Sequence, residues 1–247
     1  MNDNKEEKEM KKTKVFNVVI LDRSGSMTSI RRAALEGFNE TLASIKKAQE
    51  KHADTQEHYV SLVTFCGCET KHAFDKTPIA DTHPLTMDDY EPCCTTPLYD
   101  AMGFTLTDMH NYIKDMDDRI VAVTIITDGL ENASKEYTAD VLKKLIKKLR
   151  SEGWTFTYMG ANQNSMMEAG KIAIRNSRDF DYSDAGVCAA YCGWSAERES
   201  FYDKVANFKH NFAVSYRRMS KEERFKHYSE MADEAFDEEE KRNKKKL

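Results

Sequence analysis

The amino-acid sequence predicts an α/β fold: a Rossmann-like, doubly wound and mostly parallel sheet with helices on both faces, followed by a C-terminal helical extension. Apolar runs rich in β-branched residues recur through residues 14–182, as expected for strands buried on both faces. Amphipathic stretches separate these runs and are long enough for helical crossovers between parallel strands. The length of 247 residues is sufficient for one such domain with an appended segment.

The predicted strands are short apolar runs that contain Val, Ile, Leu and aromatic residues. Residues 14–21, KVFNVVIL, form a nearly continuous apolar run and are expected to be the central strand. The other strands are predicted at residues 59–65, 120–126 and 154–160, with 69–76 as a hairpin partner and 178–182 as an edge strand.

The predicted helices have apolar residues at three- and four-residue intervals, which give each helix one apolar face. They are expected at residues 30–45, 98–113, 141–149 and 165–174. Residues 78–95 contain Pro78, Pro84 and Pro92 among acidic and threonine residues, so this segment is predicted to be an irregular loop. Long loops of this kind often carry function.

The composition changes from Ser195 onward. Apolar residues from Phe201 to Phe236 keep helical spacing, and Ser220 with Glu223 resembles a capping box that starts a further helix. We expect this apolar stripe to pack back on the domain; the alternative is that it presents a face to another chain. The expected organisation is a charged tail over residues 1–13, an α/β domain over 14–182 and a helical extension over 183–247 that ends in a charged tail.

The charge balance disfavours nucleic-acid binding. The formal net charge is −5, and no contiguous basic stripe with interleaved aromatic residues is present. The charged amino terminus lacks the apolar stretch of a signal peptide, and no run of about 18 apolar residues predicts a membrane span. We therefore expect a cytoplasmic protein whose six cysteines are mostly reduced.

Four of the cysteines form two close pairs. The motif from Cys66 to Cys68 and the pair Cys93 and Cys94 could supply four thiolates to zinc, but neither has the two-residue spacer of zinc knuckles. We favour ordinary small core or loop residues at these positions. The remaining pair, at positions 188 and 192, would share one face of a helix, where packing is again the favoured explanation.

Three polar segments are placed to form a site. The segment DRSGS at residues 22–26 follows the first strand, TTP at 95–97 opens a helix, and TDG at 127–129 follows the IVAVTII strand. Because parallel strands end at the same edge of a sheet, Asp22 and Asp128 should approach each other there.

The residues in these segments suit a hard cation. The carboxylates of Asp22 and Asp128 and the hydroxyls of Ser24, Ser26 and Thr96 form an all-oxygen set, which favours Mg²⁺, or Mn²⁺, over zinc or copper. If the neutral hydroxyls bind directly and the aspartates act largely through water, the ion stays electron-poor. A carboxylate from another protein could then complete its coordination.

These segments resemble a known motif. DRSGS is similar to the DxSxS core of the metal-ion-dependent adhesion site of von Willebrand factor type A domains, including the inserted domains of integrins; TTPLYDA resembles their threonine loop and IITDG their aspartate strand. The order also agrees, and the resemblance covers roughly residues 14–182, as in small stand-alone bacterial or phage members. It implies direct metal ligation by Ser24, Ser26 and Thr96, with Asp22 and Asp128 as direct or water-mediated ligands.

The threonine loop departs from the common pattern, because many members have glycine where this chain has Thr95, so Thr95 could contribute to the site or reshape the loop. Structural alternatives also exist for single residues: Thr96 before Pro97 suits a helix N-cap, Ser26 could cap the helix that follows it, and Asp128 with Gly129 is an ordinary turn pair. We favour the metal site because the three segments fall at one edge in motif order.

Three charged residues lie near these segments. Asp100 and Glu131 are explained as a first-turn helix charge and a solvated loop charge. Arg23 is expected to point outward beside the ion, where it could attract a partner's carboxylate or simply be exposed.

The sequence therefore predicts a metal-dependent protein interaction module, an adaptor or assembly factor, and not an enzyme. One alternative is a magnesium-dependent phosphohydrolase, but the second carboxylate that such an enzyme needs is replaced by Ser24, and the seven histidines fall in no motif with a nucleophile. The other alternative is a structural module whose C-terminal helices bind the partner. We expect a protein partner with an acidic side chain, with no nucleic-acid or membrane partner.

Overall fold

The computed structural model describes residues 11–161, 165–181 and 183–244. Most of the expected N-terminal tail, residues 1–10, lies outside the described residues, and so does residue 182 at the end of the predicted edge strand.

A six-stranded sheet forms the centre of the structure, with the strand order β3-β2-β1-β4-β5-β6. β1 pairs in parallel with β2 and β4, and the parallel pairing continues through β5 to β6, whereas β3 is the antiparallel hairpin partner of β2. The strands are β1 (Thr13–Asp22), β2 (Gln56–Phe65), β3 (Thr70–Pro78), β4 (Arg119–Thr127), β5 (Trp154–Ala161) and β6 (Asn176–Phe180). The predicted strands are confirmed, and β1 lies inside the sheet because both of its faces are apolar.

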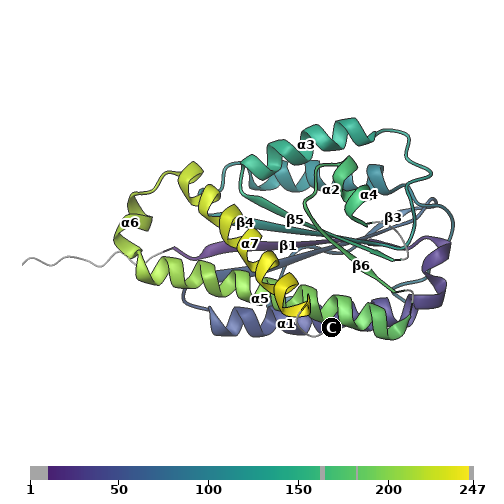
Figure 1. Ribbon diagram of the computed structural model, residues 1–247, viewed down its shortest axis with the longest axis horizontal. Coiled ribbons are helices and arrows are strands. Elements are labelled where there is room, and N and C mark those ends of the chain that lie inside the picture. Colours follow the sequence, from purple (N-terminus) through teal and green to yellow (C-terminus); the bar gives the residue numbers. More distant parts are fainter. Residues whose placement is uncertain (1–10, 162–164, 182, 245–247) are drawn as a thin grey trace, which may run out of the picture.

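Helices cover both faces of the sheet (Figure 1). One face packs against α2 (Leu98–Ile113), α3 (Ala139–Ser151) and α4 (Ser165–Lys171), and the other against α1 (Arg31–Lys51) and α5 (Asp184–Asn211). Short 3-10 turns, η1 (Gly25–Ile30) and η2 (Ile79–Asp81), precede α1 and follow β3. The sequence thus produces the doubly wound α/β fold that its alternating pattern predicts.

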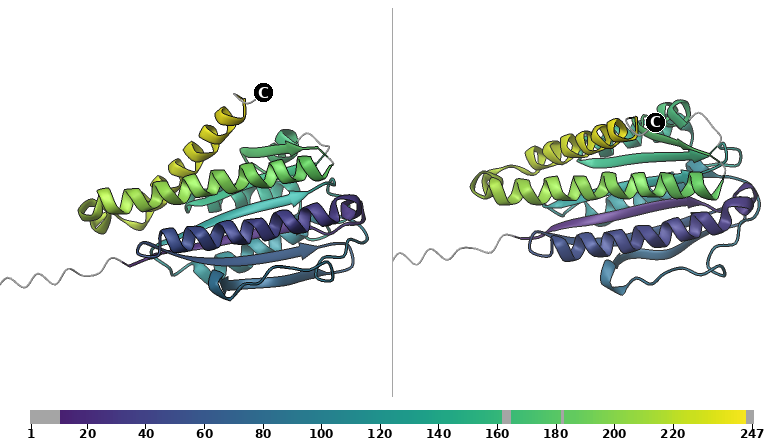
Figure 2. Two further views of the ribbon diagram at one scale, coloured as in Figure 1. Left: turned by 90° about the horizontal axis from the view of Figure 1, so that it is seen from below. Right: turned by 60° about the horizontal axis from the view of Figure 1, so that its bottom comes forward.

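A long helix opens the C-terminal extension that was expected over residues 183–247. α5 starts at Asp184, with the Ser183 hydroxyl accepting a hydrogen bond from the backbone N–H of Gly186, well before the apolar periodicity that begins at Phe201. α5 runs beside α1 in both views of Figure 2. Because α1, the sheet and α7 bury it on several sides, its apolar residues are not confined to one stripe, and the periodicity in the sequence starts late.

The C-terminal helices pack back on the sheet, as expected. Two further helices, α6 (Ala213–Arg218) and α7 (Lys221–Lys244), follow α5. Phe201, Val205, Tyr228 and Ala235 form a buried cluster with residues near the start of β1 and β4, whereas Phe212 is 54% exposed. The predicted capping box is present, because the backbone N–H of Glu223 donates to Ser220 Oγ (3.1 Å) and that of Ser220 to Glu223 Oε2 (2.7 Å).

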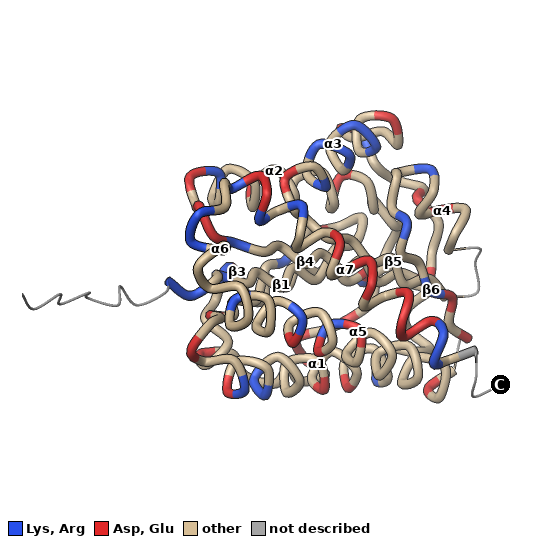
Figure 3. The backbone as a smooth tube through the Cα atoms, turned by 60° about the vertical axis from the view of Figure 1, so that its left-hand side comes forward, with Lys and Arg blue, Asp and Glu red and all other residues tan. Residues whose placement is uncertain are grey.

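Ion pairs also join α7 to its neighbours. Acidic residues of α7, red in Figure 3, face basic residues elsewhere: Lys204 of α5 pairs with Glu238 (3.0 Å) and Arg175, before β6, pairs with Asp237 (3.1 Å). Among the described residues, no helix is long and apolar enough to cross a membrane.

Candidate metal centre

The candidate site lies where β1 and β4 end side by side. Asp22 is the last residue of β1, and Thr127, the last of β4, is followed directly by Asp128. Ser24 and Ser26 lie in the turn that leaves β1 and enters η1, and Thr96 precedes α2. The pairing of β1 with β4 therefore brings two of these segments together, and the loop before α2 brings Thr96 to the same edge of the sheet.

Asp22 is the buried carboxylate of this edge. Its side chain accepts hydrogen bonds from the backbone N–H of Ser24 (2.7 Å) and from the hydroxyl of Thr127 (2.6 Å), and the residue is 0% exposed. Burial raises the pKa of Asp22 to about 6; the bonds from Thr127 and Ser24 lower it in part, and the nearby charge of Asp128 raises it further. A cation at this edge would offset the cost of burying the charged form.

The hydroxyls of the first segment connect the two strands. Ser24 Oγ lies 3.1 Å from Ser26 Oγ, and Ser26 Oγ in turn donates to Asp128 Oδ1 at 2.7 Å. Ser24 is buried, whereas Ser26 is exposed and Asp128 is partly exposed. The site therefore opens to solvent on the side of Ser26 and Asp128.

Gly129 shows how closely the oxygens converge. A methyl group placed on this glycine would lie 3.2 Å from Thr96 Oγ1, 3.7 Å from Ser26 Oγ and 3.8 Å from Asp22 Oδ2. Oxygens from the first two segments thus surround one small space that Gly129, in the third segment, leaves open. Together with the carboxylate of Asp128, this all-oxygen set fits a hard divalent cation.

Thr95 and Thr96 differ in where their hydroxyls lie. The Thr95 hydroxyl contacts Gly67 in the turn between β2 and β3, whereas the Thr96 hydroxyl faces Gly129. Thr96 is held in place by Asn132, whose Oδ1 accepts its backbone N–H at 2.9 Å and whose own N–H donates to the Thr96 carbonyl at 3.2 Å. Thr96 is therefore the threonine that faces the site.

The capping alternatives do not account for the hydroxyls. α2 begins at Leu98 with Pro97 at its N-cap position, so Thr96 lies before the cap. Ser26 lies within η1, and the residue at the N-cap of α1 is Ile30.

Two carboxylates beside the site have a role that the sequence analysis did not predict. Glu131 accepts the backbone N–H groups of Tyr99, Ala133 and Ser134, at 2.6–2.8 Å, and Asp100 accepts those of residues 135–137, at 2.8–3.0 Å. They fix the loop that carries Asp128 to the start of α2. The reading of Glu131 as a solvated loop charge is therefore wrong, and Asp100 is more than a first-turn helix charge. The sequence signal for this role is their position: Glu131 follows the TDG segment closely, and Asp100 lies in the first turn of α2.

The expectation for Arg23 is wrong. Its side chain is only 4% exposed and points away from solvent, where the guanidinium pairs with Glu69 (2.9 Å) and donates to the Glu91 carbonyl (3.0 Å). It braces the long loop 82–97 against the turn after β2 and does not face the ligand side.

The fold matches solved structures at low sequence identity. A von Willebrand factor type A protein from Catenulispora acidiphila aligns with a TM-score of 0.54 and 15% identity over 76% of this chain and 43% of its own. The pilus adhesin SpaC from Lactobacillus rhamnosus GG gives 0.55 and 13% over 78% and 31%. Proximal thread matrix protein 1 from the mussel byssus, with zinc in its MIDAS motif, gives 0.50 and 12% over 74% and 45%.

In each case this chain spans less than half of the length of the solved chain. Neither a protein-family model nor a curated protein matches the amino-acid sequence. The strand order, the helices on both faces and the match to these structures agree with the resemblance carried by the three segments. The chain has the von Willebrand factor type A fold.

Proposed function

We propose that the protein is a metal-dependent interaction module that binds an acidic side chain of a protein partner through one divalent cation, with Mg²⁺ favoured and Mn²⁺ as an alternative. The observation that carries this proposal is the convergence of oxygens of Asp22, Ser26 and Thr96 around Gly129, together with the hydrogen bond from Ser26 to Asp128. An open edge that presents neutral hydroxyls and aspartates attracts a cation, and one more anionic ligand could then complete its coordination.

Each residue of the proposed site has a distinct part. Ser24, Ser26 and Thr96 would bind the cation through neutral oxygens, and Asp22 and Asp128 would balance its charge directly or through water. The bound cation would have one coordination position left for a carboxylate oxygen of the partner. Because Ser26 is exposed, another protein could reach a cation bound there.

The alternative functions have less support. The apolar stripe of the C-terminal helices is largely buried against the starts of β1 and β4, so it is not the surface that a partner would meet first. A phosphohydrolase would need a second carboxylate where Ser24 stands, and Ser24 Oγ lies within 3.1 Å of the other serine hydroxyl. We therefore propose a non-enzymatic adaptor or assembly factor. We propose a cytoplasmic location; the Cys68–Cys94 disulfide departs from the expectation of reduced cysteines there, whereas the other four cysteines are free thiols.

The test is a pull-down with the full chain, comparing the native protein, Asp22→Ala and native protein treated with a chelator. Partners of the proposed site are lost in both treatments and return when Mg²⁺ is restored to the native protein. The matched control is Asp115→Ala, which removes an exposed carboxylate in the loop that enters β4, at the opposite edge of the sheet. Partners that persist with chelator and with Asp22→Ala would contradict the proposal.

A further inference from the structure

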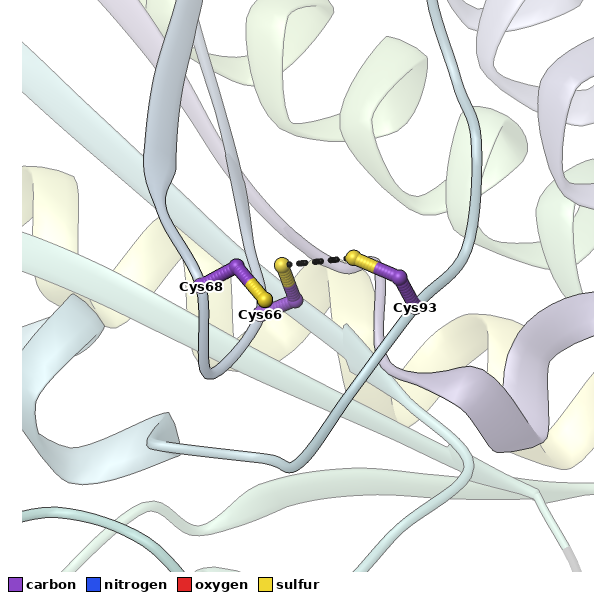
Figure 4. Close-up of side chains that lie close together, drawn as sticks. All are labelled: Cys66, Cys68 and Cys93. Atoms are coloured by element: carbon purple, nitrogen blue, oxygen red, sulfur yellow. Dashed lines mark hydrogen bonds between the residues drawn. The ribbon is translucent and has the colours of Figure 1, made fainter.

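The four cysteines of the two close pairs lie in the turn after β2 and in the loop that carries Thr96, and three of them, Cys66, Cys68 and Cys93, come together (Figure 4). Cys66 Sγ lies 3.1 Å from Cys93 Sγ, and the ligand atoms of Cys66, Cys68 and Cys93 all lie within 4.8 Å of one another. The sulfur of Cys94 is bonded to that of Cys68 in a disulfide. The turn after β2 thus supplies two sulfurs and the loop before α2 supplies the other two.

A buried cation lies beside these sulfurs. Nη1 of the buried Arg23 lies 3.9 Å from Cys93 Sγ. A guanidinium beside sulfur stabilises the thiolate form, which is the form that binds metals.

The backbone fixes the two segments against each other independently of the sulfurs. The N–H of Gly67 donates to the Thr95 carbonyl at 2.8 Å, and the N–H of Cys93 donates to the Arg23 carbonyl at 2.9 Å. The cysteines therefore meet because the turn and the loop are held together. The usual two-residue spacer between zinc-binding cysteines is therefore not needed. The cysteines come from a C-x-C turn and a C-C loop, and the fold brings these two segments together.

We propose that Cys66, Cys68, Cys93 and Cys94 form a tetrathiolate zinc site, separate from the oxygen-lined centre. Four thiolates in a tetrahedron are a preferred environment for zinc and a poor one for Mg²⁺. A dithiol reductant first transfers two electrons and two protons to the Cys68–Cys94 disulfide and is itself oxidised to a disulfide. The four resulting thiols then bind one Zn²⁺ and release four protons. The bound zinc would join the turn after β2 to the loop that carries Thr96.

The site is tested with the full chain, reduced with a dithiol, stripped of metal with a chelator and kept free of oxygen. Addition of Co²⁺ reports thiolate ligands through sulfur-to-cobalt charge-transfer absorption, which oxygen ligands do not produce. We expect one Co²⁺ per chain with this absorption and its loss on addition of one equivalent of Zn²⁺. Protein purified under reducing conditions should carry one zinc per chain by elemental analysis.

Three double variants locate the signal. Cys66→Ser with Cys93→Ser should abolish the charge-transfer absorption, while circular dichroism reports whether the fold is kept. Asp22→Ala with Asp128→Ala should leave it unchanged, because those residues belong to the oxygen-lined centre. Cys188→Ser with Cys192→Ser should also leave it unchanged; these two exposed cysteines lie close to Glu40 and are the other group of candidate ligands among the described residues.

The proposal is overturned if the reduced native protein shows no thiolate absorption with Co²⁺, or if the absorption survives Cys66→Ser with Cys93→Ser. Loss of the signal in the Cys188→Ser, Cys192→Ser variant would also overturn it. If the variant with both Cys66→Ser and Cys93→Ser unfolds, the Co²⁺ absorption is measured in Cys93→Ser alone. A site with three thiolates gives weaker absorption than one with four. Unchanged absorption in Cys93→Ser contradicts the assignment.

Discussion

The Ser26 hydroxyl donates a 2.7 Å hydrogen bond to the Asp128 carboxylate across a sequence separation of 102 residues. A cation bound between these groups would replace that bond with two metal contacts that the unfolded chain lacks. We therefore expect Mg²⁺ to stabilise the folded protein, by about 2.7 kcal/mol at a concentration 100-fold above its Kd, or about 5–10 °C in Tm. Thermal unfolding with and without Mg²⁺ measures this shift.

The Ser26→Ala and Asp128→Ala variants should lose most of the Mg²⁺-dependent shift, because each removes one proposed ligand. Asp115→Ala, at the opposite end of β4, should keep it. Equal shifts in Asp128→Ala and Asp115→Ala would mean that Mg²⁺ binds elsewhere on the protein.

Gly129→Ala tests whether the space among the oxygens is needed for the cation. The added methyl group would lie 3.2 Å from Thr96 Oγ1, so it competes with a bound ion for the same space. We expect Mg²⁺ affinity to fall by about tenfold or more, equivalent to 1.4 kcal/mol. The stability without metal should change by only about 1 kcal/mol or less. Calorimetric titration with Mg²⁺ gives the affinity.

Gly170→Ala is the matched control for this substitution, since no atom lies within 4 Å of the added methyl group. It should bind Mg²⁺ like the native protein. Native affinity in Gly129→Ala would show that the cation does not occupy this space.

The sequence predicted the sheet and the meeting of the five candidate residues at one edge because both depend on local patterns. Apolar runs identify strands buried on both faces, and a residue that directly follows such a strand lies at the carboxyl edge of the sheet. The first half of α5 shows no helical periodicity in the sequence because several neighbours bury that helix, and a periodicity argument recognises one buried face only. The division of the chain at residues 182 and 183, and metal binding itself, stay predictions.

Partners that are distant in sequence account for the remaining differences. Arg23 is buried because Glu69 and the Glu91 carbonyl receive its guanidinium, and no local pattern marks those partners. Cys188 and Cys192 are exposed and not packed in the core, because their face of α5 is turned to solvent next to Glu40. The spacing in the sequence shows that Cys188 and Cys192 share one face of a helix, but it does not show whether that face is buried or exposed.

Glu131 should support the site through the backbone. Its carboxylate accepts three backbone N–H groups and the Ser134 hydroxyl, so Glu131→Ala leaves partly buried donors without their acceptor. We expect a loss of about 1–3 kcal/mol in the free energy of unfolding. Amide hydrogen exchange should become faster at Tyr99, Ala133 and Ser134.

The control is Glu136→Ala, an exposed glutamate in the same loop. It should change neither urea unfolding nor exchange at those amides. If both variants behave alike, the hydrogen bonds of Glu131 do not hold the loop.

His58 should make stability depend on pH. Burial lowers its pKa to about 3, with smaller contributions from the charges of His52 and Arg198, while the unfolded chain keeps a value near 6.5. Below pH 6.5 the unfolded state therefore binds a proton that the folded state does not. This group should reduce stability by up to about 1.4 kcal/mol for each pH unit between 6.5 and 3, and have no effect above that window.

Urea unfolding of native protein and His58→Gln between pH 7.5 and about 5 measures this dependence. The variant should lose less stability on acidification than the native protein. His72→Gln, which removes an exposed histidine from β3, should keep the native slope. If the free energy of unfolding fell equally with pH in His58→Gln and in the native protein, His58 would not be a group that takes up a proton only on unfolding.

Lys209 tests whether α5 is energetically part of the fold. Its side chain is 0% exposed, and the ammonium group donates to Asp118 (3.1 Å), Thr13 Oγ1 (2.8 Å) and the Lys11 carbonyl (2.8 Å) near the start of β1 and β4. Lys209→Met removes the cation and leaves these acceptors behind, so we expect a loss of about 3 kcal/mol in the free energy of unfolding.

Lys204→Met, on the same helix but paired with the exposed Glu238, should cost about 1 kcal/mol or less. Adding Asp118→Asn to Lys209→Met should recover part of the loss, because the unpaired carboxylate is then removed. Equal effects of the two lysine substitutions in urea unfolding would mean that α5 contributes to stability through its apolar contacts and not through this buried ion pair.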